Sequence, residues 1–88
     1  MTHELSLLAD LMRKIESVSR EHGERPVVGV TLRVGALAHI APDHLREHFQ
    51  HASRGTVASD ARLVINETHD LHDPHAQDIM LESVEVAG

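Results

Sequence analysis

The 88-residue chain contains no cysteine, and this absence limits both how it can fold and what it can bind. Without cysteine there is neither a disulfide framework nor a thiolate site for zinc or an iron–sulfur cluster. A chain of this length lies near the lower limit at which an apolar core alone stabilises a domain. We therefore expect a single domain, residues 1–88, in which any metal is held by histidine, carboxylate, amine or backbone nitrogen.

The apolar residues divide into two helical and three strand-like segments. From Leu5 to Val18 they recur at helical spacing, and Gly23 is suited to follow the end of this helix. A second helix is expected from about Pro42 to Ser53, because proline and aspartate open it. Three segments have the β-branched or alternating pattern of strands: Val27–Val34, Ala61–Glu67 and Ile79–Val86.

This order of segments predicts an α/β (α+β) fold, with two helices packed on a small mixed three-stranded sheet. The strand–helix–strand unit implies a right-handed crossover and a parallel pair. The last two strands, joined by residues 68–78, are expected to pair as antiparallel neighbours. The residues expected to face the core from the first strand and the second helix are Val28, Val30, Leu32, Val34, Leu45, Phe49 and Ala52.

Charge and motif content exclude several functional classes. The net charge is −6 without basic blocks, so we expect no nucleic-acid partner. No apolar run is long enough to cross a bilayer and no secretory leader pattern opens the chain, which favours no membrane association and a cytoplasmic protein. Nucleophile motifs, glycine-rich phosphate loops and spaced carboxylate pairs are also missing, so the chain is not expected to be an enzyme.

The first residues form a possible ligand set for nickel or copper. An imidazole at His3 can fold back so that its ring nitrogen, the terminal amine and the intervening amides lie in one plane, an arrangement that suits Ni(II) and Cu(II). Removal of Met1 would make His3 the second residue, and both forms can close a planar site. The alternative is structural, with Thr2 as the N-cap and Glu4 favoured by the helix dipole.

Two further groups of histidines are candidate metal ligands with simpler alternatives. His69, His72 and His75 follow one another at three-residue spacing in a polar segment that also contains Asp78, and a solvated loop is the favoured explanation of them. Residues 44, 48 and 51 are histidines along one stripe of the second helix. Two histidines one turn apart can chelate zinc, but the glutamate of a hydrolytic zinc site is not in its position. A pH-sensitive or partner-facing edge is an alternative, and the border between core and water is the favoured one. His39, after the first strand, can approach the metal end or complete a turn.

Several ordered stretches together resemble the HypA/HybF family of hydrogenase nickel-incorporation proteins. The resemblance covers roughly residues 3–67 and resumes at the last strand. It is carried by His3-Glu4-Leu5-Ser6-Leu7, by Val30-Thr31-Leu32-Arg33-Val34-Gly35-Ala36-Leu37-Ala38-His39-Ile40-Ala41-Pro42, by Phe49, by Arg54-Gly55-Thr56-Val57 and by Ala61-Arg62-Leu63.

The resemblance implies a nickel metallochaperone that delivers Ni(II) for maturation of [NiFe]-hydrogenase. Its implied partners are a hydrogenase large-subunit precursor and a maturation GTPase. Members of the family begin Met-His-Glu and bind Ni(II) through the terminal amine, the histidine and nearby backbone nitrogens. That histidine falls on His3 and the glutamate on Glu4, while Thr2 is an insertion that loss of Met1 would offset. The expected metal site is therefore Thr2, His3 and Glu4.

One departure from the family is large. Its members carry a zinc ribbon with two Cys-x-x-Cys pairs between the second and third strands, where this chain has only residues 68–78. We therefore expect a short member without zinc. An alternative function is an adaptor or accessory subunit of a hydrogenase or its maturation complex, which carries no metal.

Overall fold

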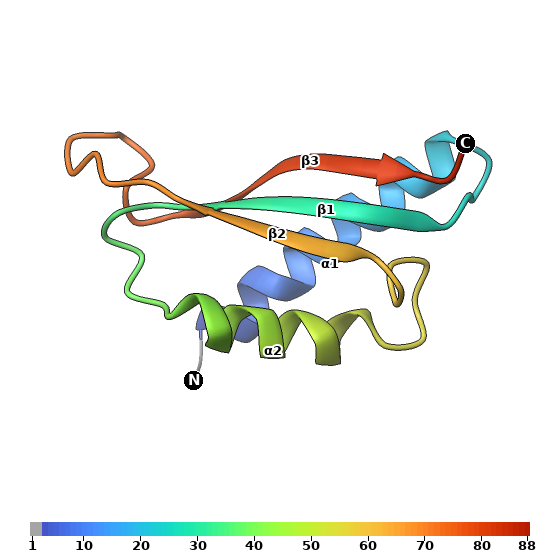
Figure 1. Ribbon diagram of the computed structural model, residues 1–88, viewed down its shortest axis with the longest axis horizontal. Coiled ribbons are helices and arrows are strands. Elements are labelled where there is room, and N and C mark those ends of the chain that lie inside the picture. The colour runs from blue at the N-terminus through green and yellow to red at the C-terminus, as the bar shows by residue number, and fades with distance from the viewer. Residues whose placement is uncertain (1–2) are drawn as a thin grey trace.

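The structure is a computed structural model that describes residues 3–88, with side chains described from residue 6 onward. Two helices and three strands follow one another in the predicted order (Figure 1). Neither helix of the described chain has the length and apolarity that a bilayer-crossing segment needs. The elements are α1 (His3–Glu21), β1 (Val27–Val34), α2 (Pro42–Ser53), β2 (Arg62–Glu67) and β3 (Ile79–Val86).

Helix α1 forms because one of its sides is apolar and its end is defined by backbone geometry. Leu8, Leu11 and Ile15 are at most 2% exposed, so the predicted apolar stripe is buried. The helix ends at Glu21, and Gly23 follows the helix end as expected, with a φ of 74° that costs glycine little. The backbone N–H of Glu24 then donates to the Ser19 carbonyl at 2.8 Å, which closes the last turn.

The sheet has the order β2-β1-β3, with β1 in the centre. As predicted, β1 and β2 are parallel, and they are joined through α2. The expectation that the last two strands are neighbours was wrong, because β3 pairs antiparallel with β1 and not with β2. The physical reason is that β1 is long and apolar. In the central position, the backbone N–H and C=O groups on both of its edges are hydrogen-bonded. Residues 68–78 cross the end of β1 and so bring β3 to its free edge.

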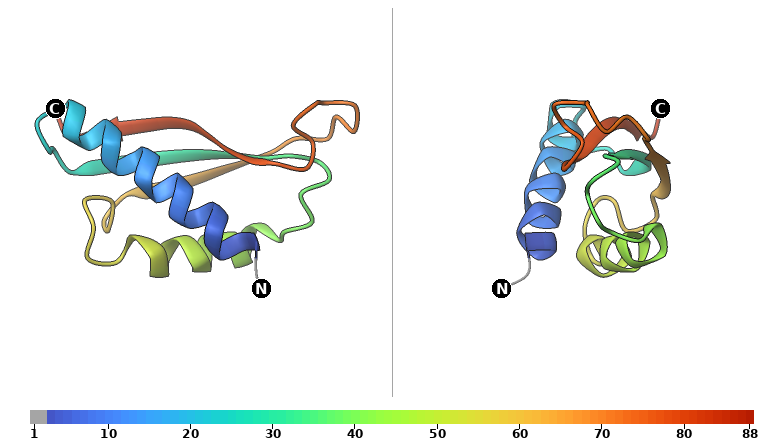
Figure 2. Two further views of the ribbon diagram at one scale, coloured as in Figure 1. Left: turned by 180° about the vertical axis from the view of Figure 1, so that it is seen from behind. Right: turned by 90° about the vertical axis from the view of Figure 1, so that its left-hand side faces the viewer.

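Both helices cover the same face of the sheet and leave the other face open (Figure 2). The core lies between these two layers, and its most completely buried large side chains include Ile15, Leu32 and Leu45. Because only one face is covered, buried and exposed residues should alternate along each strand. On the open face, Val28, Val64 and Met80 are 46%, 42% and 39% exposed.

The exposure of Val28 contradicts the prediction that it shares a buried face with Val30. The pairing with β3 shifts between Val27 and Gly29, so β1 has one extra residue at this point. A bulge of this kind reverses the alternation, which buries Val27 and turns Val28 outward. Ala52 on α2 was also expected in the core, but it is exposed and Ser53 is buried instead.

Residues 68–78 return across the end of β1 and are hydrogen-bonded to it. The Thr68 N–H donates to the Val34 carbonyl, the Gly35 N–H donates to the Asp78 carbonyl, and the Leu37 N–H donates to the Ala76 carbonyl at 2.7 Å. A Cβ atom at position 35 would collide with the Ala76 carbonyl group. Glycine at this position therefore permits the return segment to dock on β1.

We expect Gly35→Ala to lower the free energy of unfolding by about 1–3 kcal/mol, because the added methyl group displaces backbone that cannot move independently. The matched control is Gly29→Ala in β1, whose added Cβ would meet the Glu85 side chain at an ordinary 3.5 Å. This control should be neutral or stabilising by up to about 1 kcal/mol. Urea unfolding followed by circular dichroism measures both changes. Equal stabilities for the two variants would contradict the docking role of Gly35.

Candidate metal-binding site

Two of the three predicted nickel ligands, His3 and Glu4, belong to α1. Thr2 lies outside the described residues, and the side chains of His3 and Glu4 lie outside the described part as well. The backbone of both His3 and Glu4 is in the first turn of the helix. Helices α1 and α2 begin at the same end of the molecule, which brings the loop before α2 to this end too (Figures 1 and 2).

His39 lies in that loop and has an unusual backbone conformation. Its φ is 54°, in the left-handed region that residues other than glycine seldom occupy. Its side chain is exposed, three residues before the start of α2. The structure therefore places His39 at a strained turn near the helix starts, and such strain is concentrated at functional sites in proteins generally.

The histidines of α2 are partly brought together. The rings of His44 and His48 have centroids 4.9 Å apart and planes inclined by 32°. His48 is half-buried, whereas His44 and His51 are exposed. The stripe predicted from their spacing is therefore present, with His48 at its inner edge.

A groove of about 490 Å³ separates α1 from α2 beside these rings. His48 and His51 line it from α2, and Glu16 lines it from α1. Sequence reasoning did not bring Glu16 to these histidines, although its place next to the buried Ile15 indicated a position at the edge of the helix interface. The other lining residues are Leu8, Ala9, Met12, Arg13 and Ala52.

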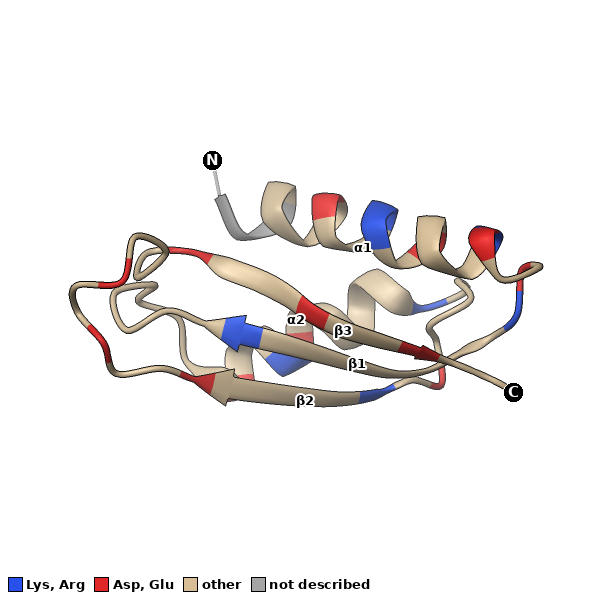
Figure 3. Ribbon diagram, turned by 90° about the horizontal axis from the view of Figure 1, so that it is seen from above, with Lys and Arg blue, Asp and Glu red and all other residues tan. Residues whose placement is uncertain are grey.

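One arginine of each helix has a defined partner, and only Arg13 lines this groove. Arg13 forms an ion pair with Asp10 on its own helix. Arg46 donates a hydrogen bond to the Leu63 carbonyl of β2 at 2.8 Å. Over the described residues, acidic and basic positions are interspersed and do not form a basic block (Figure 3).

The histidines of residues 68–78 do not form a preformed site. The backbone N–H groups of His72 and His75 donate to the carboxylates of Asp70 and Asp73, each at 2.9 Å. His75 Nδ1 and Asp78 Oδ2 lie 3.0 Å apart. These carboxylates shape turns, which favours the solvated-loop alternative. Within the part of the chain that the structure describes, no three histidine, aspartate or glutamate side chains gather to hold a metal ion.

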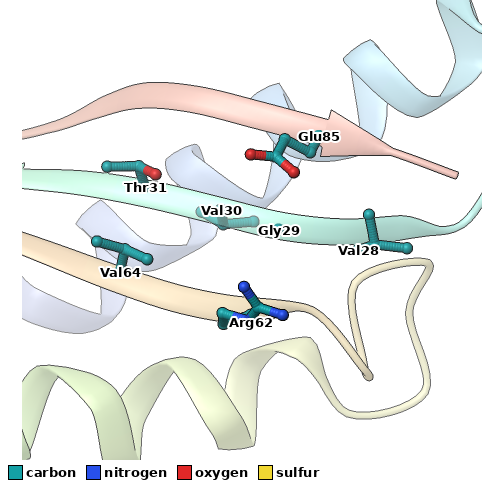
Figure 4. A pocket seen from close by; sticks show the side chains of 7 residues that line it. All are labelled: Val28, Gly29, Val30, Thr31, Arg62, Val64 and Glu85. Carbon is teal, nitrogen blue, oxygen red and sulfur yellow. The ribbon is translucent and has the colours of Figure 1, made fainter.

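The open face of the sheet has a small hollow of about 150 Å³ over Gly29 (Figure 4). Arg62 and Glu85 flank it, and Val28 and Val64 add apolar surface. This hollow has one cationic and one anionic group and no imidazole. With a single carboxylate and no imidazole, the hollow lacks the ligand set of a transition-metal site.

Residues 1–72 match the family model described as "Hydrogenase/urease nickel incorporation, metallochaperone, hypA". The chain belongs to the HypA family. The family resemblance carried by the stretches between His3 and the second strand is therefore confirmed.

Curated relatives support this membership over the same region. The hydrogenase maturation factor HypA of Acidithiobacillus ferrooxidans is 41% identical over 63 residues, which cover 72% of this chain and 56% of the relative. The corresponding factor of Moorella thermoacetica is 37% identical over 65 residues, covering 74% and 58%. The factor of Methanosarcina barkeri is 35% identical over 63 residues, covering 72% and 47%. The chain thus matches about half the length of these relatives.

The fold is similar to a solved HypA structure. The solution structure of the Ni metallochaperone HypA from Helicobacter pylori superposes with a TM-score of 0.77 over 97% of both chains, at 15% identity. At this identity the likeness concerns the fold alone. The arrangement of two helices on a mixed sheet is therefore that of HypA.

The turn at Asp73 should contribute more to stability than the exposed pair next to it. Asp73 accepts from the His75 N–H and from Arg33 at 3.1 Å, and its side chain is 15% exposed. Asp73→Ala should therefore cost about 1–2 kcal/mol of unfolding free energy. Asp78→Ala removes only a pair whose side chains are both more than half exposed, so its cost should stay within about 0.5 kcal/mol. Thermal unfolding measures the difference, and a larger effect at Asp78 would contradict this assignment.

Proposed function

We propose that this chain is a nickel metallochaperone that delivers Ni(II) for maturation of [NiFe]-hydrogenase. The observation that supports this most is the family match, which spans residues 1–72 and so includes the possible ligands at His3 and Glu4. Nickel here is cargo and not a resident cofactor, so binding must be both selective and reversible.

The proposed site consists of four nitrogens: the terminal amine, the His3 imidazole and two backbone amides. These amides are those of Thr2 and His3 if Met1 is retained, and those of His3 and Glu4 if Met1 is removed. These donors fit Ni(II), because nitrogen ligands in a plane suit a d⁸ ion, whereas Mg²⁺ requires oxygen ligands and Zn²⁺ prefers a tetrahedron. The position also favours release, because a ligand set at a chain end can open by rotation of a few bonds. We propose no zinc site, since the chain has no cysteine.

The proposed partners are a hydrogenase large-subunit precursor, which receives the ion, and a maturation GTPase. The proposed location of both interactions is the cytoplasm. The protein carries the ion without catalysing a reaction. The protein holds the nickel ion with few ligands, so that a recipient with more ligands can take over the ion.

The first test is nickel titration of the untagged protein, followed by optical absorption. A planar nitrogen complex of Ni(II) is diamagnetic and yellow, so the wild type should develop this absorption up to one ion per chain. His3→Ala should abolish it, because one of the planar ligands is lost. Intact-mass spectrometry of the same samples reports the state of Met1 and the number of bound ions.

The matched control is His72→Ala, which removes an exposed imidazole at the other end of the chain. This variant should keep the planar absorption unchanged. An unaltered planar spectrum in His3→Ala, or a wild type that stays colourless with excess nickel, would contradict the proposed site.

The open sheet face favours the alternative of an adaptor. Three exposed apolar side chains, Val28, Val64 and Met80, lie on it without a covering helix, and β3 is an edge strand. An adaptor should bind the purified maturation GTPase equally well after its terminal amine has been acetylated, whereas Val64→Glu should weaken binding. Metal delivery requires the free amine, so the acetylated protein should no longer transfer nickel. If it still binds the GTPase, the chain has both the delivery and the adaptor activity.

A further inference from the structure

The imidazole rings of His44 and His48 lie next to each other on the surface of α2. They are one helical turn apart, a spacing at which side chains meet on the helix surface. Their ring centroids are 4.9 Å apart and the planes are inclined by 32°, so the rings are neighbours without being stacked. The pair belongs to a 12-residue helix that is anchored by the buried Leu45 and Phe49. The backbone that sets the spacing of the two rings is therefore held by the core.

Two imidazoles in this arrangement are a bidentate ligand for a transition-metal ion. Imidazole suits Ni(II), Cu(II) and Zn(II), and paired histidines one turn apart are a recurrent way of binding them. His44 is exposed and His48 is half-buried at the edge of the groove, so water can complete the coordination sphere. His48 has a further interaction besides the ring contact. This is compatible with ligation, because the second ring nitrogen of a metal-bound histidine commonly holds an orienting partner.

The charges around the pair favour a cation. Asp43 precedes His44 and Glu47 precedes His48, while Glu16 lines the groove from the facing helix. Arg13, which also lines the groove, forms an exposed ion pair with Asp10, and Arg46 donates to the Leu63 carbonyl. Carboxylates that are close but do not ligate raise the local concentration of divalent ions.

We propose that His44 and His48 together bind one divalent transition-metal ion, at a site separate from the terminal amine and His3. Only two protein nitrogens ligate this ion, so the site is open, exchanges its water ligands readily and binds more weakly than a planar site with four nitrogens. Ni(II) held in this way is octahedral and paramagnetic, in contrast to the diamagnetic planar complex. The proposal does not depend on the proposed function, because neither imidazole belongs to the terminal site.

The test uses the full chain with its terminal amine acetylated, so that the planar site cannot form. Ni(II) is added near neutral pH while the proton NMR spectrum is recorded. We expect paramagnetically shifted imidazole signals from two histidines and one ion per chain. His44→Ala should weaken binding by about tenfold or more, because removal of one ligand converts a chelate into a single contact. His48→Gln should have the same effect and guards against a folding defect at the half-buried position.

The matched control is His51→Ala, which removes the third histidine of the stripe but leaves the pair intact. Its affinity should stay within about twofold of the acetylated wild type. Absence of paramagnetic shifts in the acetylated protein would overturn the proposal, as would binding that persists in His44→Ala or that is lost equally in His51→Ala. Persistent binding of this kind would assign the ion to other histidines, such as those of residues 69–75. Because the terminal amine is blocked throughout, none of these outcomes bears on the planar nickel site that the amine and His3 are proposed to form.

Discussion

The hydrogen bonding of β1 on both of its edges is the constraint on which the rest of the domain depends. β1 pairs with β2 on one side and with β3 on the other. Its ends are tied as well, since the Val27 N–H donates to the Val57 carbonyl and the Gly35 N–H donates to the Asp78 carbonyl. The helices then cover the apolar face that this arrangement creates. The segment that leads from β1 into α2 is therefore attached to the most constrained strand of the sheet.

Most of the fold could be predicted because the apolar pattern of each segment agrees with the face that the segment buries in the structure. The stripe from Leu8 to Ile15 and the run from Val27 to Val34 identify their elements unambiguously, since each has one periodicity. The errors arise where a nonlocal contact decides. The bulge that exposes Val28 depends on its register with β3, and the order of the strands depends on how residues 68–78 cross β1. Neither property can be read from the residues of a single segment.

For the candidate sites too, contacts within one element could be predicted and contacts between elements could not. The contact between His44 and His48 follows from helical spacing, so it was foreseeable from the sequence. The role of Asp70 and Asp73 in forming turns could not be predicted from the sequence. An aspartate in a polar loop can either ligate a metal or accept backbone hydrogen bonds. The proximity of Glu16 to the α2 histidines required the packing of two helices separated by a strand. The geometry of the ligands at Thr2, His3 and Glu4 lies outside the described side chains and rests on coordination chemistry.

The way residues 68–78 are attached has a consequence for the length of the connection between β2 and β3. This segment is fixed to the sheet at Thr68, at Asp73 through Arg33, and again at Ala76 and Asp78, whereas residues 69–72 are exposed and form its tip. Extra residues introduced at this tip would therefore change neither the strand register nor the packing of the core. Loop closure costs rise only slowly with length, so the free energy of folding would be little affected. The three strands can thus keep the same pairing with a connection of different length between β2 and β3.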